Sequence, residues 1–210
     1  TTEIYTLSLH DALPICFPTK ITFRQTAFSD NSCMLDGGAI ASGYNTRMIL
    51  SDCQFQNNFA ESNCGAIGIS GKPDAEASKA KFSKVLFIGN HCKSDGGAIA
   101  SATHSQMIFE ECRFENNWSE GSCGAIGIGG KDKKNLSDAT FTKTSFIGNH
   151  CKVDGGAMVI GRYSRAKFDK CLMEKNYAEE KTGGAILILG KDSSFATIAD
   201  FQGVIFRENR

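Results

Sequence analysis

Aspartate, histidine and cysteine recur close together in this sequence, and such side chains could hydrolyse a bond or hold a metal ion. An aspartate precedes a Gly-Gly pair at Asp36, Asp95 and Asp154, and His91 and His150 each stand four residues before one of these aspartates, next to a cysteine. Acidic residues can cleave polysaccharides by general acid–base chemistry, and histidine with cysteine can bind zinc. All of these residues recur at regular intervals, so the repeat that carries them has to be defined first.

Two short motifs alternate along the chain. The first is Gly-Gly-Ala-Ile or a close variant, and cysteine replaces its first glycine in two copies. The second is Phe-x-x-Asn, with Met173 replacing the aromatic residue once. Apolar residues before the second motif are spaced two apart, which is typical of strands. The first motif begins at Gly37, Cys64, Gly96, Cys123, Gly155 and Gly183.

Self-similarity at a fixed period predicts a solenoid, in which each turn buries its apolar face against its neighbours. The intervals between copies of the first motif are 27, 32, 27, 32 and 28 residues. We therefore predict an all-β parallel solenoid of about seven turns with three short strands per turn. The extra residues of every second turn lie in polar loops, in 71–80 and 130–139, and should project from one edge.

The first fifteen residues, TTEIYTLSLHDALPI, share nothing with the repeats. They resemble the conceptual translation of a common short-read sequencing adapter at every position. A signal peptide does not fit, because no basic segment precedes an apolar core and His10 and Asp11 interrupt the stretch. We expect residues 1–15 to be an adapter-derived artefact outside the fold. Residues 16–210 should be a β-helix repeat domain truncated at both ends, a metagenomic fragment of a longer chain.

Composition excludes two classes of partner. The chain has 23 basic and 23 acidic residues, so its formal net charge gives no reason to expect nucleic acid. No apolar run approaches the roughly 20 residues of a membrane helix, so we expect no membrane insertion by this segment. Nine cysteines favour an oxidising compartment, and Cys16 is the odd one at the junction with the first fifteen residues.

The period assigns structural roles to most of the conspicuous residues. Asparagine tolerates left-handed turns, and stacked amides can bond between turns, so we predict a structural asparagine ladder. Cys53, Cys112 and Cys171 occupy an inward strand position and should be core residues. Trp118 falls in a turn, where packing at the core edge and an exposed contact are both open. The ladder comprises Asn31, Asn58, Asn90, Asn117, Asn149, Asn176 and Asn209.

The other five cysteines of the repeats lie in turns, and we treat them as possible disulfide partners. Members of one cysteine series are two turns apart, about 9.6 Å, which is too far for a disulfide. Cysteines of adjacent turns could pair, and we expect at least one such pair to be bridged or bridgeable. The candidate pairs are Cys33–Cys64 with Cys92–Cys123, or Cys64–Cys92 with Cys123–Cys151.

We predict no catalytic, metal-binding or cofactor-binding residue. The aspartates repeat at the same two-turn spacing of about 9.6 Å, which is too wide for a retaining pair of carboxylates. The sequence contains no Cys-x-x-Cys motif of the kind that zinc sites use.

The alternation of GGA[ILM] with FxxN over nearly all of 17–210 resembles the repeat of the chlamydial polymorphic outer-membrane proteins. That resemblance implies a right-handed parallel β-helix, because the family consists of such helices, mostly autotransporter passengers and in several cases adhesins. It also implies an extracellular or outer-membrane-associated location and a host surface protein or glycan as partner. The CGAI copies at Cys64 and Cys123 depart from the family motif.

We therefore expect a fragment of a secreted or cell-surface protein, adhesin-like and non-catalytic, that binds or acts as a scaffold. The alternative is a carbohydrate-active β-helix enzyme, either a polysaccharide lyase or a glycoside hydrolase. A cleft with three converging acidic residues from adjacent turns would favour the enzyme, and a flat repetitive surface would favour the adhesin.

Overall fold

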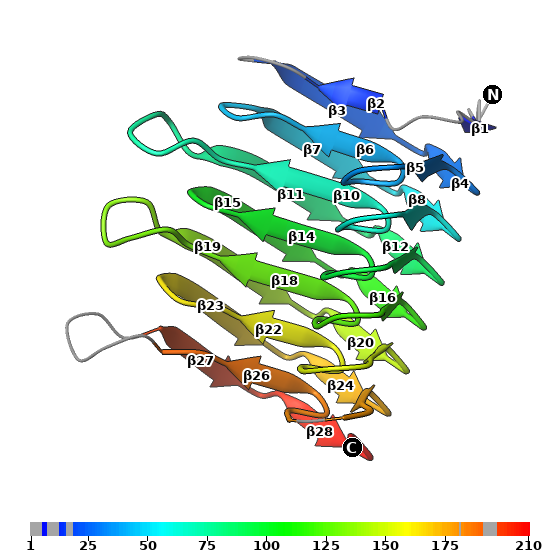
Figure 1. Cartoon of the computed structure of the whole chain (residues 1–210), viewed down its shortest axis with the longest axis vertical. Helices are drawn as coiled ribbons and strands as arrows, with labels where there is room; N and C mark the ends of the chain where they lie inside the picture. Colours follow the sequence, from blue (N-terminus) through cyan, green and yellow to red (C-terminus); the bar gives the residue numbers. More distant parts are fainter. Residues whose placement is uncertain (1–5, 8–12, 16–18, 181, 191–196) are drawn as a thin grey trace.

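The computed structural model describes residues 6–7, 13–15, 19–180, 182–190 and 197–210, and Cys16 lies outside these ranges. Over this part of the chain, the secondary structure consists of short strands joined by turns, and every strand pair is parallel (Figure 1). The described residues include no helix long and apolar enough to cross a membrane.

The strands form four sheets, which we call A to D. Sheet A holds the Phe-x-x-Asn strands and sheet B the Gly-Gly-Ala-Ile strands. Sheet A comprises β1 (Thr6–Leu7), β4 (Ala27–Ser29), β8 (Gln54–Gln56), β12 (Leu86–Ile88), β16 (Arg113–Glu115), β20 (Ser145–Ile147), β24 (Leu172–Glu174) and β28 (Ile205–Arg207). Sheet B comprises β2 (Leu13–Ile15), β6 (Ile40–Ser42), β10 (Ile67–Ser70), β14 (Ile99–Ala102), β18 (Ile126–Gly129), β22 (Met158–Ile160) and β26 (Ile186–Ile188).

Sheet C holds the longest strands, and sheet D consists of two-residue strands that follow the ladder asparagines. Sheet C comprises β3 (Lys20–Arg24), β7 (Arg47–Ser51), β11 (Ser78–Ser83), β15 (Ser105–Glu110), β19 (Ser137–Thr142), β23 (Ser164–Asp169) and β27 (Ile198–Gln202). Sheet D comprises β5 (Ser32–Cys33), β9 (Phe59–Ala60), β13 (His91–Cys92), β17 (Trp118–Ser119), β21 (His150–Cys151) and β25 (Tyr177–Ala178).

The chain is a right-handed parallel β-helix, and the predicted fold class is confirmed. Each turn contributes one strand to each of sheets C, A, D and B in that order, so a complete turn has four strands. The prediction of three omitted sheet D. Two-residue strands contain only one inward and one outward position, so a period of two cannot be read from them.

The core is built from side chains stacked in register between turns. In sheet A the ring of Phe87 stacks on Phe114 with centroids 4.6 Å apart, and in sheet C Phe109 stacks on Phe141 at 4.8 Å. Edge-to-face contacts join the two stacks, as between Phe109 and Phe114 at 5.7 Å. Aromatic pairs of both geometries stabilise beyond the area that they bury. These stacks explain why aromatic residues recur at fixed positions of the repeat.

Left-handed backbone makes three corners in each turn. The corner between sheets C and A uses residues such as Asp52 and Lys84, and the corner between sheets A and D uses the residue before each ladder asparagine, such as Asn57. The ladder asparagines themselves are absent from the positive-φ positions, so tolerance of left-handed turns is not the reason for them. The third corner, between sheets D and B, is the first position of the Gly-Gly motif.

The two glycines of that motif are favoured for different reasons. At the first position φ is +80° at Gly96, and an added Cβ would lie 2.6 Å from the carbonyl oxygen of Ile99. At the second position an added Cβ on Gly97 would overlap the carbonyl oxygen of Gly124 in the next turn. The first glycine therefore relieves local strain, and the second allows neighbouring turns to approach.

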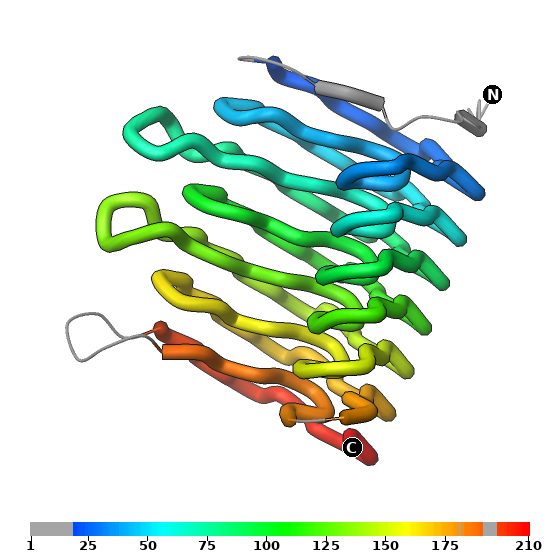
Figure 2. Tube along the Cα trace, viewed as in Figure 1, coloured from blue at the N-terminus to red at the C-terminus, as the bar shows by residue number. Residues whose placement is uncertain are grey.

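Connections between sheets B and C project from one edge, as predicted from the loop lengths. The two described long connections, 71–77 and 130–136, leave the same side of the solenoid two turns apart (Figure 2). They touch each other, because the backbone N–H of Asp74 donates to Oδ1 of Asn135 at 3.0 Å. The corresponding connection two turns farther on, after β26, includes 191–196, which lie outside the described residues.

Two segments of the first fifteen residues pair with the N-terminal edge of the solenoid. Strand β1 pairs with β4, and β2 pairs with β6, both in parallel. An open strand edge presents unpaired N–H and C=O groups to any extended backbone. The pairing therefore carries no information about the origin of these residues, and their assignment to an adapter stays a prediction.

Candidate functional site

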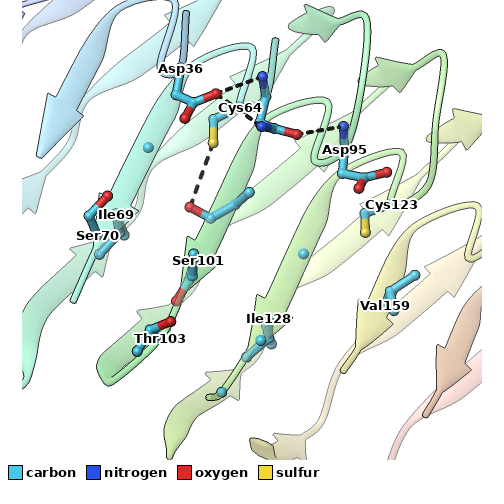
Figure 3. A pocket seen from close by; sticks show the side chains of 17 residues that line it. Asp36, Cys64, Ile69, Ser70, Asp95, Ser101, Thr103, Cys123, Ile128 and Val159 are labelled. Atoms are coloured by element: carbon cyan, nitrogen blue, oxygen red, sulfur yellow. Dashed lines mark hydrogen bonds between the residues drawn. The ribbon is translucent and has the colours of Figure 1, made fainter. Parts of the chain in front are cut away.

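A shallow groove of about 370 Å³ crosses the outer face of sheet B. The groove forms where the outward residues of successive strands are small, namely Gly68, Ala100 and Gly127. Val159 lies at its far end. Asp36, Asp95, Cys64 and Cys123 line its edge (Figure 3). This groove brings together two of the recurrent aspartates and both of the cysteines that depart from the glycine motif.

Cys64 and Cys123 occupy the left-handed corner that glycine holds in the other turns, with φ of 63° and 64°. The residue four positions later is glycine in these two turns only, as Gly68 and Gly127. The cysteine side chain takes the space that this glycine leaves, since Sγ of Cys123 would lie 3.2 Å from a Cβ added at Gly127. The pairing of cysteine at the first position with glycine at the fifth is visible in the sequence.

Both groove thiols are protonated at neutral pH. Burial, followed by the negative charge of Asp36, raises the pKa of the Cys64 thiol well above its ordinary value. Burial and then Asp95 have the same effect on Cys123. The Cys64 thiol donates to the carbonyl oxygen of Ala100 at 3.7 Å. Because thiolates, and not thiols, attack substrates and bind metals, these cysteines are poor nucleophiles and ligands.

The recurrent aspartates bond to the next turn of the solenoid. Oδ1 of Asp36 accepts from the backbone N–H of Asn63 at 2.9 Å and from its side-chain amide at 3.0 Å. Oδ1 of Asp95 accepts from the N–H of Ser122, and Oδ1 of Asp154 from the N–H of Thr182. One oxygen of each carboxylate is thus used to close the corner before sheet B.

The histidines lie in an outer column of sheet D. The column begins with Phe59, whose ring is tilted by 46° against that of His91. The rings of His91, Trp118, His150 and Tyr177 then stack in sequence, with His91 and Trp118 closest at 4.1 Å between centroids. The rings are half-buried, apart from Tyr177, which is exposed. Nε2 of His91 and Nε1 of Trp118 are buried without a hydrogen-bond partner. Trp118 is therefore packed between two imidazoles at the edge of the core.

Burial in the stack favours the uncharged form of both histidines. Burial lowers the pKa of His91, and Lys93, Lys152 and His150 lower it further, while Glu120 opposes the change. Burial also lowers the pKa of His150, against the effect of Glu179. The ring stack gives both histidines a packing role. No group of three or more His, Cys, Asp or Glu side chains among the described residues could hold a metal ion.

The asparagine series forms a continuous buried ladder. Nδ2 of Asn90 donates to Oδ1 of Asn117 at 2.9 Å and to the carbonyl oxygen of Phe55 at 3.0 Å. Oδ1 of Asn117 also accepts from the backbone N–H of Asn90 at 3.0 Å. Each interior amide therefore uses both of its N–H groups and accepts two bonds. The same contacts recur at Asn58, Asn149 and Asn176.

The turn cysteines belong to two different environments. Cys92 and Cys151 are the inward residues of sheet D, and burial raises the pKa of their thiols to about 12 and about 11. The Cys92 sulfur faces the backbone N–H groups of Cys64 and Gly65, whereas the Cys64 sulfur faces the groove. Cys64, Cys92, Cys123 and Cys151 are free thiols in this structure. All four predicted disulfide pairs, of which Cys33–Cys64 is one, stay a prediction.

Comparison with known proteins gives one match. Residues 84–102 match the family model described as the Chlamydia polymorphic membrane protein repeat. This stretch runs from the corner before β12 through the Phe-x-x-Asn motif and sheet D into the GGAI strand β14. The predicted resemblance is confirmed there, and it indicates a repeat of surface-protein type. No curated protein and no solved structure matches the chain.

Proposed function

We propose that this chain is part of a surface-displayed, non-catalytic protein that binds a partner or acts as a scaffold, in the manner of an adhesin or an autotransporter passenger. The proposal rests on the hydrogen bonds of the recurrent aspartates, which serve the fold. Asp36, Asp95 and Asp154 each accept a hydrogen bond from the next turn, in register. The match at 84–102 to a membrane-protein repeat supports an extracellular or outer-membrane location. A host surface protein or glycan is the expected partner.

Long regular faces suit this role. A parallel β-helix presents columns of side chains at a spacing of about 4.8 Å, and each added turn extends them. Loops can vary on one edge without disturbing the core, and the long connections 71–77 and 130–136 lie together there. Such a surface can make many weak contacts with an extended or repetitive partner.

One observation favours the alternative of a glycoside hydrolase. Asp36 and Asp95 line the same groove two turns apart, about 9.6 Å by strand spacing, near the upper limit for inverting enzymes. Each of these carboxylates nevertheless has one oxygen bonded to the next turn. A lyase or hydrolase in this groove would require at least one of them as its acid or base.

Cell binding and polysaccharide cleavage distinguish the two functions. The full chain, labelled with a fluorophore, is titrated onto intact epithelial cells, and the release of reducing ends from a panel of polysaccharides is measured in parallel. The proposed function predicts saturable binding and no release. Release that is lost on Asp95→Asn, without saturable binding to cells, would identify the enzyme instead.

A further inference from the structure

The outer face of sheet C carries an uninterrupted column of basic side chains. Lys20 on β3 pairs in register with Arg47 on β7, and Arg47 pairs with Lys79 on β11. All three side chains are exposed. Neighbouring strands are about 4.8 Å apart, so three positive charges stand in single file over about 10 Å along the axis of the solenoid.

Nothing acidic in these three strands offsets the column. Strands β3, β7 and β11 contain five basic residues and no acidic residue. Within the described part of the chain, the only ion pair that any of these five forms is Lys81 with Glu110 at 3.0 Å. Asp74 and Glu76, in the connection before Lys79, form no ion pair with the column.

The same column is neutralised farther along the sheet. After Lys79 the register continues through Gln106 to Asp138 and then to Arg165. The Arg165 guanidinium bonds both oxygens of Asp138, at 2.6 and 2.8 Å. The fold therefore accepts a paired arrangement at this position, and the absence of one at Lys20, Arg47 and Lys79 is a local property of the sequence.

Like charges directly opposite in a sheet are destabilising. A bound chain of anions would remove this repulsion and would add charge-assisted hydrogen bonds, bidentate in the case of the Arg47 guanidinium. Because the cations stand in single file along the solenoid axis, they fit a linear polymer that carries anionic groups on successive units. The chain as a whole has no net charge, so the attraction is confined to this face.

The side chains around the column select among polyanions. The other outward residues of these strands are small, basic or aliphatic, and none of them carries an aromatic ring on which a nucleic-acid base could stack. They are Thr22, Ile49 and Lys81 in one row and Arg24, Ser51 and Ser83 in the next. A flat sheet face cannot enter the groove of a duplex. Ile49 is the only outward apolar side chain of these three strands and is half-buried, and β15 adds a single exposed isoleucine, Ile108. The face therefore has no apolar cluster that could anchor it in a lipid surface.

We infer that the column of Lys20, Arg47 and Lys79 binds a linear sulfated polysaccharide laid along the axis of the solenoid. The inference rests on the proposed surface-binding function and names the class of glycan that the surface recognises. Sulfates contact the column directly, and hydroxyl groups of neighbouring side chains such as Thr22 supply further polar contacts.

The test measures binding of the full chain to immobilised heparin as a function of salt. The variant Lys20→Gln/Arg47→Gln/Lys79→Gln removes the column. The control Arg162→Gln/Lys167→Gln/Lys170→Gln removes one arginine and two lysines, also exposed, from elsewhere on the surface. Equal melting temperatures of the three proteins establish that all of them are folded.

We expect the column variant to lose affinity by about tenfold or more, equivalent to about 1.4 kcal/mol, and to show a weaker salt dependence. The control should bind within about twofold of the parent, and desulfated heparin should bind weakly to all three. Equal affinity of the parent and the column variant would overturn the inference, as would an equal loss in the control. Tighter binding of single-stranded DNA or anionic vesicles through the same column would assign it to another partner.

Cell binding separates this inference from the proposed function. If the column variant binds cells as well as the parent does and neither binds heparin, the polysaccharide site is refuted while the surface function stands. If heparin binds through the column but the parent does not bind cells, the site stands and the proposed surface function fails.

Discussion

At the scale of single residues, the CGAI copies show that a side chain at the first position of the motif takes the space of the side chain at the fifth position of the same turn. In glycine turns the fifth residue of the motif carries a side chain, such as Ala100 or Val159, and in cysteine turns it is Gly68 or Gly127. A Cβ added at Gly155 would lie 2.7 Å from Cγ2 of Val159, so both positions cannot be filled there. The outer face of sheet B accepts one side chain per turn at this point.

This exclusion predicts coupling between the two positions. Gly155→Cys should destabilise the protein by about 1–3 kcal/mol, because the new side chain overlaps Val159. Adding Val159→Gly should recover part of that loss, although glycine in a strand itself costs about 0.5–1 kcal/mol. Chemical denaturation of both single variants and the double variant gives the coupling energy.

A distant substitution of the same kind provides the control. Ala41 is the equivalent fifth residue four copies of the motif earlier, and Ala41→Gly should be additive with Gly155→Cys. Additive effects of Gly155→Cys and Val159→Gly would show that the two side chains do not compete for space, and the explanation of the CGAI copies would then be wrong.

At the scale of elements, the asparagine ladder joins neighbouring turns through buried side-chain hydrogen bonds. Asn117→Ala should cost about 3 kcal/mol or more, since one side-chain N–H and the backbone N–H of Asn90 lose their buried acceptor and the carbonyl oxygen of Phe87 loses a donor. Asn209→Ala is the matched control at the end of the ladder, where the side chain is half-buried and the loss should be smaller. Equal losses in urea denaturation would contradict a cooperative buried ladder.

The ring column of sheet D makes stability depend on pH. Folding lowers the pKa of His91 and His150 below the ordinary value of 6.5, so the unfolded chain binds protons more readily. Stability is therefore fully present above pH 6.5 and falls as the pH drops through the lowered values. Each histidine can contribute a slope of at most about 1.4 kcal/mol per pH unit.

Denaturation between pH 7.5 and 5 measures this slope. The variant His91→Phe/His150→Phe keeps an aromatic stack and should show a flatter profile over the same range. His104 lies outside the ring column, in the connection between β14 and β15, and His104→Phe is the control for a histidine substitution that leaves the column intact. A double variant with the slope of the parent would exclude the stacked histidines as its source.

The sequence predicts elements well where a side chain recurs for a packing reason. Phenylalanine spacing identified sheets A and C, and the Gly-Gly motif identified sheet B. At each of these positions, packing restricts which residue type fits. Sheet D was missed because Phe59, His91 and Trp118 share only aromatic shape. The left-handed corners were misplaced because positions such as Asp52 and Lys84 accept many residue types. The groove and the basic column depend on neighbours in adjacent turns, which only the register of the strands reveals.

At the scale of the whole molecule, the two ends of the solenoid differ in what covers them. Strands β1 and β2 pair with β4 and β6 at the N-terminal edge. At the other end, Phe201, Ile205 and Phe206 remain exposed on the last strands of sheets C and A. Uncovered edges and apolar ends of solenoids favour association between chains.

Removal of residues 1–15 tests both the domain boundary and this tendency. If these residues are an artefact outside the fold, their removal should leave the melting temperature within about 2–4 °C of the parent, which for a chain of this size corresponds to about 1 kcal/mol. The opened edges of β4 and β6 should at the same time increase association with concentration, as measured by sedimentation velocity. A protein of residues 16–210 that melts much lower would make the first fifteen residues part of the fold, and one that stays monomeric at high concentration would show that these edges are protected by other means.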